Sequence, residues 1–488
     1  MRTHLPPPSS AAAAFLALML AVATAMPLIL VHQALSWHDQ QRLLQILLIL
    51  AATLALAFSS GHARPIGRMA RLTLLGVLAL GLASTAFAQM PLWSLTEISL
   101  LTGTLAIALA VRRLHAAVPS ADAWLMLAAA CLCLGAIFKY LLAYAAAISD
   151  PGAVFPVYEL VGGFSHPRFL GQLATLLIPL LLAGVFFAAD AWPRRYAAAL
   201  WLLAALLWLA VISTGTRGTW LALGLSASVL VLLGVAGRRL ALLILSSAMT
   251  GLVLTYLLFT VVPDRLGIVS MNHPVERLTT SLSGRDVAWS MSARMIMENP
   301  MLGVGPMHFA AEPNVVAAHP HNAPLQLAAE WGIPATVLLM LLAASAAWRM
   351  LNTIRLSRPL ENPEDGLRIA LFASLTGAAV QAMVDGMIVI PTTMVWAALS
   401  IGWAWALQPP LVSSSAQLAN PVHASGSAAG LIKHLAMLAP FVASAILLTV
   451  VAARDLPRII TTQQAEWAST ELADLPRPRF WVRGFITP

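Results

Sequence analysis

Long apolar runs alternate with short polar connections along almost the entire chain. Most of the runs are about 17–25 residues long, the length that an α-helix needs to cross the hydrocarbon core of a bilayer. The pattern predicts about 13 such helices, at residues 11–31, 43–59, 72–89, 98–111, 123–145, 169–189, 197–213, 218–236, 240–262, 324–347, 369–386, 389–408 and 435–452. The sequence therefore predicts an all-α polytopic integral membrane protein with about 12–13 transmembrane helices.

The composition excludes a water-soluble globular protein. Hydrophobic residues make up 59% of the chain and charged residues only 10%, too few to cover the surface of a soluble protein of 488 residues. The net charge of +8 could indicate nucleic acid as a partner. However, the Arg residues form short clusters between the apolar runs and no single basic face, so we expect membrane lipids and no nucleic acid.

The positive charges predict the orientation in the membrane. The connections on the same side as the N-terminus contain most of the Lys and Arg residues, whereas the short connections on the other side contain only Arg42, Arg168 and Arg217. The positive-inside rule therefore predicts a cytoplasmic N-terminus in a bacterial inner membrane. If the segments on either side of Asp385 formed one broken span, the C-terminus would change sides.

This topology divides the chain into a large membrane region and a short tail. Residues 1–452 would form one polytopic domain, in which residues 263–323 are a long periplasmic loop with amphipathic helices and residues 408–434, rich in Ser, Ala and Pro, are a cytoplasmic linker. Residues 453–488 would be a short periplasmic tail, too small to fold around a core of its own.

The first candidate functional group is the polar interruption between two apolar runs at Thr216, Arg217 and Gly218. The arginine stands at the outer end of a span, where the positive-inside bias disfavours it. It could extend to lipid headgroups. Alternatively, the small neighbours could let an anion approach the backbone while the guanidinium binds phosphate oxygens in pairs.

The second candidate group lies in the long outer loop, from Gly284 to Trp289. Helical spacing places three side chains on one face and three on another: Val287, Met291 and Met295, against Arg285, Trp289 and Ser292. This pattern favours an amphipathic helix at the membrane interface. Arg294 and Glu298 have the spacing of an i,i+4 pair. Asp286 could neutralise Arg285, although side chains at i and i+1 point apart, so a structural and a functional arginine remain open.

The third candidate group is the sequence His319-Pro320-His321-Asn322 just before a span. Asn322 is a good N-cap, so His321 would stand at a helix N-terminus, where the helix dipole favours a neutral imidazole that can accept a proton. The two histidines could be a base with its neighbour, a hydrogen-bonded structural pair or part of a metal site. No Cys or carboxylate lies close in sequence to complete a zinc shell.

Further polar groups lie at or near membrane depth. Arg168 begins a span on the outer side and could contact a sugar, a phosphate or lipid headgroups. Lys139 and Asp385 could be partners within the bundle. Together, two arginines and a histidine at a water–membrane boundary indicate a site that binds a lipid-linked phosphate ester and removes a proton from a hydroxyl, which is group-transfer chemistry.

These motifs resemble the bacterial O-antigen ligase and O-oligosaccharyltransferase superfamily, whose relatives include the O-antigen polymerases. The likeness extends over roughly residues 155–405. Its most specific part is His321-Asn322 followed after nine residues by Gly332-Ile333-Pro334-Ala335-Thr336, which is similar to the family's His-Asn, x9, Gly-x-x-Gly-Thr pattern. Ala335 replaces the second glycine. Thr216-Arg217-Gly218 and Gly284-Arg285 match the family's two arginine motifs.

The resemblance implies a glycosyltransferase that passes a glycan from an undecaprenyl-diphosphate carrier to an acceptor hydroxyl on the periplasmic face, with inversion at the anomeric carbon and with neither a metal nor another cofactor. Arg217 and Arg285 would bind the diphosphate, His321 would deprotonate the acceptor, and His319 would orient His321 or share its role. Four other residues are assigned to substrate binding: Arg168, Trp289, Asn322 and Arg294.

The acceptor is less clearly specified. The chain length and the lack of a large periplasmic domain favour lipid A-core, hence an O-antigen ligase of lipopolysaccharide biosynthesis. A protein hydroxyl is the alternative, because Gln326, Glu330 and the tail residues Arg477–Trp481 are also similar to protein-directed members. A polymerase is a third reading. From another class, a transporter of lipid anions would also need cations among helices, but no inverted repeat is visible and the polar groups gather on one side. A purely structural subunit would need none of them.

Overall fold

The computed structural model describes residues 10–58, 66–149, 157–187, 194–268, 284–312, 314, 316–356, 363–409, 428–468 and 477–486. Each predicted apolar segment coincides with one helix. These helices are α1 (Ser10–Ala25), α2 (Trp37–Phe58), α3 (Arg68–Phe87), α4 (Pro91–Ala117), α5 (Ala121–Ser149), α6 (Pro167–Phe187), α7 (Arg194–Ser213), α8 (Arg217–Val231), α9 (Gly234–Tyr256), α12 (Ala323–Leu356), α13 (Pro363–Gln381), α14 (Pro391–Ala406) and α15 (Ala428–Ala468).

The predicted all-α polytopic class is confirmed. Within the described residues, nine helices are long and apolar enough to cross a membrane, and α1 and α8 are apolar but shorter. Two further helices that the pattern counted as spans are less suited to this by length or charge. The first turns of α13 contain Glu364, Asp365 and Arg368, and α14 has only 16 residues.

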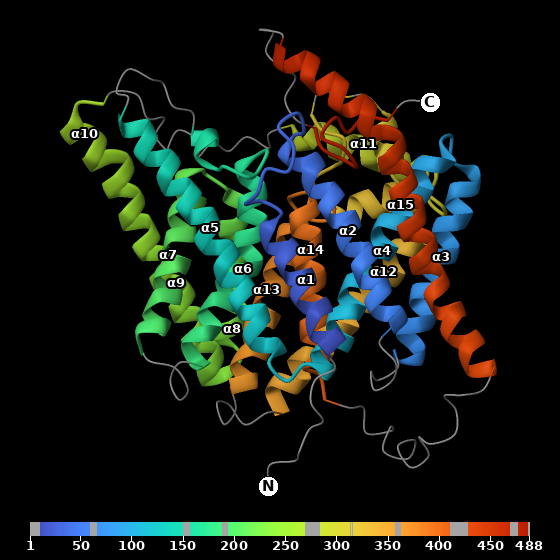
Figure 1. Ribbon diagram of the computed structural model, residues 1–488, viewed down its shortest axis with the longest axis horizontal. Coiled ribbons are helices and arrows are strands. Elements are labelled where there is room, and N and C mark those ends of the chain that lie inside the picture. Colours follow the sequence, from blue (N-terminus) through green and yellow to red (C-terminus); the bar gives the residue numbers. More distant parts are fainter. Residues whose placement is uncertain are drawn as a thin grey trace.

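The connections sort to two opposite ends of the helix bundle. Figure 1 shows the N-terminus at one end, and α10 (Val262–Leu266), α11 (Arg285–Glu298) and the C-terminus at the other. We call the latter the α11 end. Helices α10 and α11 and the described residues near the C-terminus therefore lie at the same end. Of the predicted linker at residues 408–434, residues 410–427 lie outside the described part, and α15 already begins at Ala428.

Hydrogen bonds between helices fix the part of the bundle that carries the candidate site. Helices α6, α8 and α13 pack side by side. Ser226 Oγ of α8 donates to Ala373 O at 2.8 Å, and Ser374 Oγ of α13 donates to Leu176 O of α6 at 2.7 Å. Small hydroxyl residues let helices approach closely and join them within an apolar bundle. The starts of α6 and α8 are thereby held beside the end of α13.

Helix α12 is broken near the α11 end, although the pattern predicted a continuous span. Gly332 has φ 83° and ψ 163°, which is not helical, and Pro334 has no N–H to donate. The loop after α11 crosses this break: Val304 N donates to Ala329 O at 2.9 Å and Ile333 N donates to Pro300 O at 2.9 Å. A Cβ on Gly332 would lie 2.3 Å from Met301 O. The glycine motif therefore makes room for the crossing loop.

Two charged residues differ from their expected places. Arg42 was predicted in an outer connection, but it lies in the second turn of α2 and is completely buried. Asp385 was one candidate partner for Lys139, but Lys139 Nζ instead lies 4.3 Å from the centre of the Trp37 ring and donates to Pro27 O at 3.3 Å. A flexible ammonium group is satisfied there by an aromatic face and a carbonyl.

Candidate active site

Four residues from distant parts of the sequence meet at the α11 end. Arg168 lies in the first turn of α6, Arg217 and Arg285 are the first residues of α8 and α11, and His321 directly precedes the N-cap of α12. Their charges act on each other. Burial, followed by the positive charges of Arg168 and Arg285, lowers the pKa of His321 to about 3. Burial and the charges of Arg168 and Arg217 lower the pKa of Arg285. The structure therefore brings the predicted arginines and histidine together.

The start of α8 fits closely between two neighbouring helices. A Cβ on Gly171 of α6 would lie 2.6 Å from Thr219 Oγ1, so α6 and α8 approach at a glycine. On the other side, the space beside Gly218 is bordered by Gln381 and Val384. Gly215 turns the chain with φ 65° just before Arg217. The small residues predicted around Arg217 thus let the helix start approach α6 and the turn after α13.

Arg285 is held by the turn that follows α13. Gly284 precedes α11 with φ 77°, which only glycine adopts readily. The Nε of Arg285 donates to Val384 O at 3.1 Å, and the nearby Asp385 carboxylate partly offsets the lowering of its pKa. The guanidinium is half-buried. This placement fixes the side chain and leaves part of it accessible.

One face of α11 packs against the rest of the bundle. Ala288, Ser292 and Met295 are buried, whereas Val287 is 41% exposed. This face packs against Phe309 and Ala329, where α12 passes close by and small side chains fit best. Of the three apolar side chains that the helical spacing placed on one face, Met295 is buried and Met291 packs against this cluster, whereas Val287 is exposed.

Trp289 and Asn322 hold the loop that carries the two histidines. The Nε1 of Trp289 donates to Pro320 O at 3.0 Å. The Oδ1 of Asn322 accepts from Leu325 N at 2.9 Å, which confirms the predicted N-cap, and its Nδ2 donates to Met383 O at 2.9 Å. Between them, His321 has φ 53°, a left-handed conformation that costs energy for a residue with a side chain. The surrounding hydrogen bonds enforce this backbone shape.

The surroundings of His321 favour a neutral imidazole. Its side chain is 13% exposed, so the ring is largely shielded from water but remains accessible at one edge. Its Nδ1 lies 3.8 Å from Asp385 Oδ1. A pKa of about 3 keeps the imidazole neutral at neutral pH, and the free electron pair of a ring nitrogen can accept a proton. Because the charges of Arg168 and Arg285 oppose protonation of His321, a bound anion would make proton uptake easier.

His319 lies directly behind His321. The ring centres are 4.2 Å apart and the planes are inclined by 66°. His319 is buried, and its Nδ1 is 3.2 Å from Pro478 O. Since a carbonyl only accepts hydrogen bonds, Nδ1 carries the proton and Nε2 the electron pair. A Cβ on Gly386 would lie 2.3 Å from this Nε2. Burial and the neighbouring His321 lower the pKa of His319.

The structure adds Asp385, to which the sequence assigned another partner. Its Oδ1 accepts from Gly386 N at 2.9 Å, and Gln381 Nε2 lies 3.4 Å from its Oδ2. Gln381 is held in turn by Thr175 Oγ1 of α6. These contacts aim the carboxylate at His321. A carboxylate at membrane depth was the signal in the sequence, but its partner was not readable because 64 residues separate the two.

The structure does not bring Arg294 to this group. Arg294 follows Arg285 by nine residues, which at 100° per residue places it on the opposite side of α11 and about 13 Å further along the axis. It is exposed. Among the described residues, no ion pair joins Arg294 to Glu298. Its assignment to substrate binding stays a prediction.

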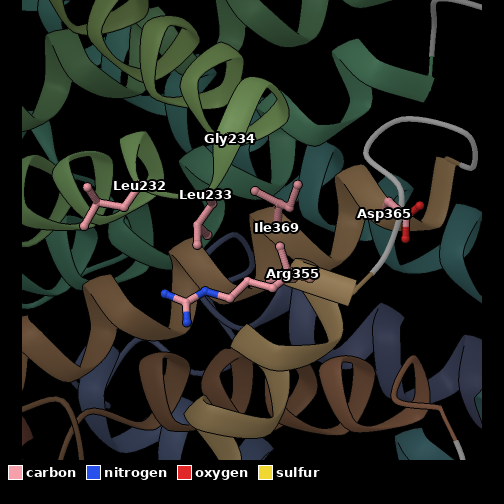
Figure 2. A pocket seen from close by; sticks show the side chains of 7 residues that line it. Leu232, Leu233, Gly234, Arg355, Asp365 and Ile369 are labelled. Carbon is pink, nitrogen blue, oxygen red and sulfur yellow. The ribbon is translucent and has the colours of Figure 1, made fainter.

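Other features of the molecule lie apart from the site. A cavity of about 270 Å³ opens at the opposite end of the bundle, between the α8–α9 turn and the facing ends of α12 and α13. Figure 2 shows Arg355 and Asp365 among its lining residues, none of which belongs to the candidate site. In the described part of the chain, no three His, Cys, Asp or Glu side chains are grouped so that they could hold a metal ion.

Comparison with known proteins identifies the family of the central segment. Residues 202–340 match the family model of the O-antigen ligase. This segment contains Arg217, Arg285, His319 and His321, so the resemblance seen in the sequence is confirmed for the part of the chain that carries these residues. No curated protein matches the chain. The protein is a multi-pass membrane protein in which residues 202–340 match this family, and Arg168 and Asp385 lie outside the matched segment.

Proposed function

We propose that this protein is a glycan ligase. It transfers an oligosaccharide or polysaccharide from undecaprenyl diphosphate to an acceptor hydroxyl at the periplasmic face of the bacterial inner membrane. The observation that carries the proposal is the largely shielded His321 beside Arg168 and Arg285, with Arg217 next to Arg285, at one end of the bundle. A base and a cluster of cations are the two elements that this reaction requires.

The arginines would bind the donor. A diphosphate carries several oxygen acceptors, and guanidinium groups bind such oxygens in pairs through parallel N–H groups. Arg217 and Arg285 project from helix N-termini, where the helix dipole adds positive potential. Arg168 acts on the same region. Together they would offset the negative charge that grows on the leaving diphosphate.

The transfer step follows from this arrangement. The acceptor oxygen attacks the anomeric carbon and forms the new C–O bond, while the bond from that carbon to the phosphate oxygen breaks. The hydroxyl proton moves to a ring nitrogen of His321, and undecaprenyl diphosphate leaves with the electron pair. Attack opposite the leaving group inverts the anomeric carbon. Asp385 would stabilise the imidazolium, because its carboxylate lies 3.8 Å from Nδ1.

Lipid A-core is the acceptor that we propose, which makes the protein an O-antigen ligase of lipopolysaccharide biosynthesis. The tail residues that resembled protein-directed ligases support this choice. Arg479, Phe480 and Trp481 are buried inside the bundle, so they offer no surface to a protein acceptor. The polar groups also gather at one end of the bundle, whereas a transporter would place them near the middle of the membrane.

Purified protein in detergent tests the proposal directly. Undecaprenyl-diphosphate-linked glycan and lipid A-core are mixed with the wild type or with His321→Asn, and the products are analysed by mass spectrometry. The wild type is expected to form a glycosidic bond, and the variant is expected to lose this activity while keeping its gel-filtration profile. If the wild type forms no product with lipid A-core but glycosylates a protein hydroxyl, the acceptor is a protein and the choice of lipid A-core is wrong.

A further inference from the structure

The last described segment of the chain is folded into the α11 end of the bundle. We call residues Arg477–Ile486 the C-terminal strap. Arg479, Phe480, Trp481 and Ile486 are all buried, with Arg479 only 3% exposed. The strap lies against α2, α4 and the loop that precedes α12. A segment this polar enters the interior only if its groups are fully paired.

Arg479 anchors the strap between two helices. Its Nη2 donates to both carboxylate oxygens of Glu97 of α4, at 2.8 and 2.7 Å, and to Glu330 of α12 at 2.5 Å. With its amide oxygen turned toward Arg479, Gln326 accepts from Nη1 at 2.8 Å. Glu330 also accepts from Phe309 N at 3.0 Å. A planar guanidinium held in this way has one position and one orientation.

The backbone of the strap is held equally firmly on its other side. The Phe480 carbonyl accepts from Arg42 Nε at 3.0 Å and from His38 Nε2 at 3.2 Å. Val482 N donates to Asp39 Oδ1 at 2.6 Å. The ring of Phe480 lies 5.3 Å from the Arg42 guanidinium carbon. Polar residues of α2, buried for no reason visible in the sequence, thus serve to bind the strap.

The residue next to this anchor touches the candidate site. The carbonyl of Pro478 accepts from His319 Nδ1 at 3.2 Å, and the His319 ring lies against His321. The strap is the partner that decides which nitrogen of His319 carries the proton and how its ring is turned. No other hydrogen bond to a His319 ring nitrogen is present in the described part of the chain.

We propose that the C-terminal strap is a positioning element for transfer, with Arg479 as its anchor. Arg479 fixes the Pro478 carbonyl, this carbonyl fixes the tautomer and orientation of His319, and His319 supports the ring of His321 from behind. The proposal rests on the proposed function in one respect only: the reaction that depends on His321 is glycan transfer. A displacement of a reacting group by about 1 Å is enough to slow a reaction about 100-fold.

The test compares Arg479→Met with wild type in the full-length protein, with Arg483→Met as the matched control. Arg483 is exposed, lies in the same strap and loses the same charge. Transfer kinetics are measured together with chemical modification of His319 by diethyl pyrocarbonate, read by mass spectrometry. In Arg479→Met, kcat is expected to fall about 10- to 100-fold with the donor KM within about twofold. His319, protected in wild type and in Arg483→Met, is expected to become modified.

A second variant separates positioning from folding. Arg479→Met leaves Glu97 and Glu330 buried without their cation, so it can destabilise the protein. Glu97→Gln with Arg479→Met removes one charge of each sign and is expected to restore a wild-type melting temperature while kcat stays low and His319 stays reactive. If this folded double variant has wild-type kcat and a protected His319, or if neither variant folds, the strap is structural only and the proposal is overturned.

The proposed function and this inference fail in different ways. If the wild type forms no glycosidic bond, glycan transfer is wrong, but the modification of His319 still shows whether Arg479 holds it. If the wild type transfers glycan and Arg479→Met does so at the wild-type rate with His319 protected, the strap proposal is wrong and the ligase stands.

Discussion

Two clusters of charged residues lie at the same end of this protein and differ in how their charges are balanced. Around His321, burial and the neighbouring arginines lower the pKa of Arg285. Around the strap, burial would also lower the pKa of Arg479, but the carboxylates of Glu330 and Glu97 outweigh it and raise that pKa. The first cluster carries surplus positive charge and the second is neutralised within the protein. This difference fits the proposal that arginine binds an anion in the first cluster, whereas in the second it joins parts of the fold.

Exposure agrees with this division. The side chain of His321 is 13% exposed and Arg285 is half-buried, whereas Arg479 and Arg42 are almost completely enclosed. A guanidinium that is to meet a ligand must remain accessible, and one that joins two helices need not. We therefore propose two different roles for arginine in this protein, and only the structure shows which arginine has which role.

The largest effect is expected when the base is removed. His321→Asn should lower kcat about 10²- to 10⁴-fold, the usual contribution of a general base. Asparagine is chosen because it tolerates the positive φ of this position better than most residues. The measurement is the rate of transfer by purified protein, and His434→Asn, a histidine of α15 far from the site, serves as the control. An equal loss of transfer rate in both variants would mean that His321 has no specific role in the reaction.

Loss of the strap cation should affect stability in addition to its effect on kcat. Arg479→Met is expected to lower the free energy of unfolding by about 3–5 kcal/mol, because removing one partner leaves buried charges without compensation. Arg285→Gln should leave it unchanged or higher, since it removes a charge that its neighbours repel. Thermal unfolding in detergent measures both. If both variants were equally destabilised, the two clusters would not differ as we infer.

Loss of an arginine at the candidate site should chiefly weaken binding of the donor. Arg285→Gln is expected to raise the donor KM about 10- to 100-fold, because charge-assisted hydrogen bonds to phosphate are each worth about 1.5–3 kcal/mol. Arg265→Gln, an exposed cation of α10 at the same end, is the matched control and should bind the donor normally. Initial rates at varied donor concentration give both KM values. An unchanged KM for Arg285→Gln would remove Arg285 from the diphosphate site.

The pH dependence should be the smallest and most specific effect. In the donor-free protein, the lowered pKa of His321, about 3, means that kcat/KM should not fall with a midpoint near 6.5, the ordinary value for histidine. A bound diphosphate offsets the arginine charges and so raises this pKa. The acid limb of kcat should therefore lie at higher pH than that of kcat/KM. A kcat/KM profile with a midpoint near 6.5 would contradict this.

The sequence predicted the parts of the site that local patterns mark. Each helix was visible as an apolar run, and Arg217, Arg285 and His321 stood out because they lie at helix starts next to glycine or an N-cap residue. The break in α12 was marked by Gly332 and Pro334 but was predicted as a continuous span. Its purpose, room for the loop from Pro300 to Gly305, depends on contacts between segments that no local pattern records.

The remaining parts could not be predicted because they depend on distant pairs. Arg479 meets Glu97 across 382 residues, and Asp385 meets His321 across the two helices α12 and α13. The helical spacing placed Val287 on one face with Met291 and Met295, but close packing against α12 buries Ala288 and leaves Val287 exposed. Which distant side chains meet depends on how the helices pack against one another, and this packing could not be predicted from the apolar pattern.

A structure of the protein with undecaprenyl diphosphate bound, determined by cryo-electron microscopy, tests the central claim most directly. We predict that the diphosphate lies within hydrogen-bonding distance of Arg217 and Arg285, with His321 facing the position of the anomeric carbon. A diphosphate bound elsewhere, for example in the cavity beside Arg355 at the opposite end of the bundle, would contradict the account.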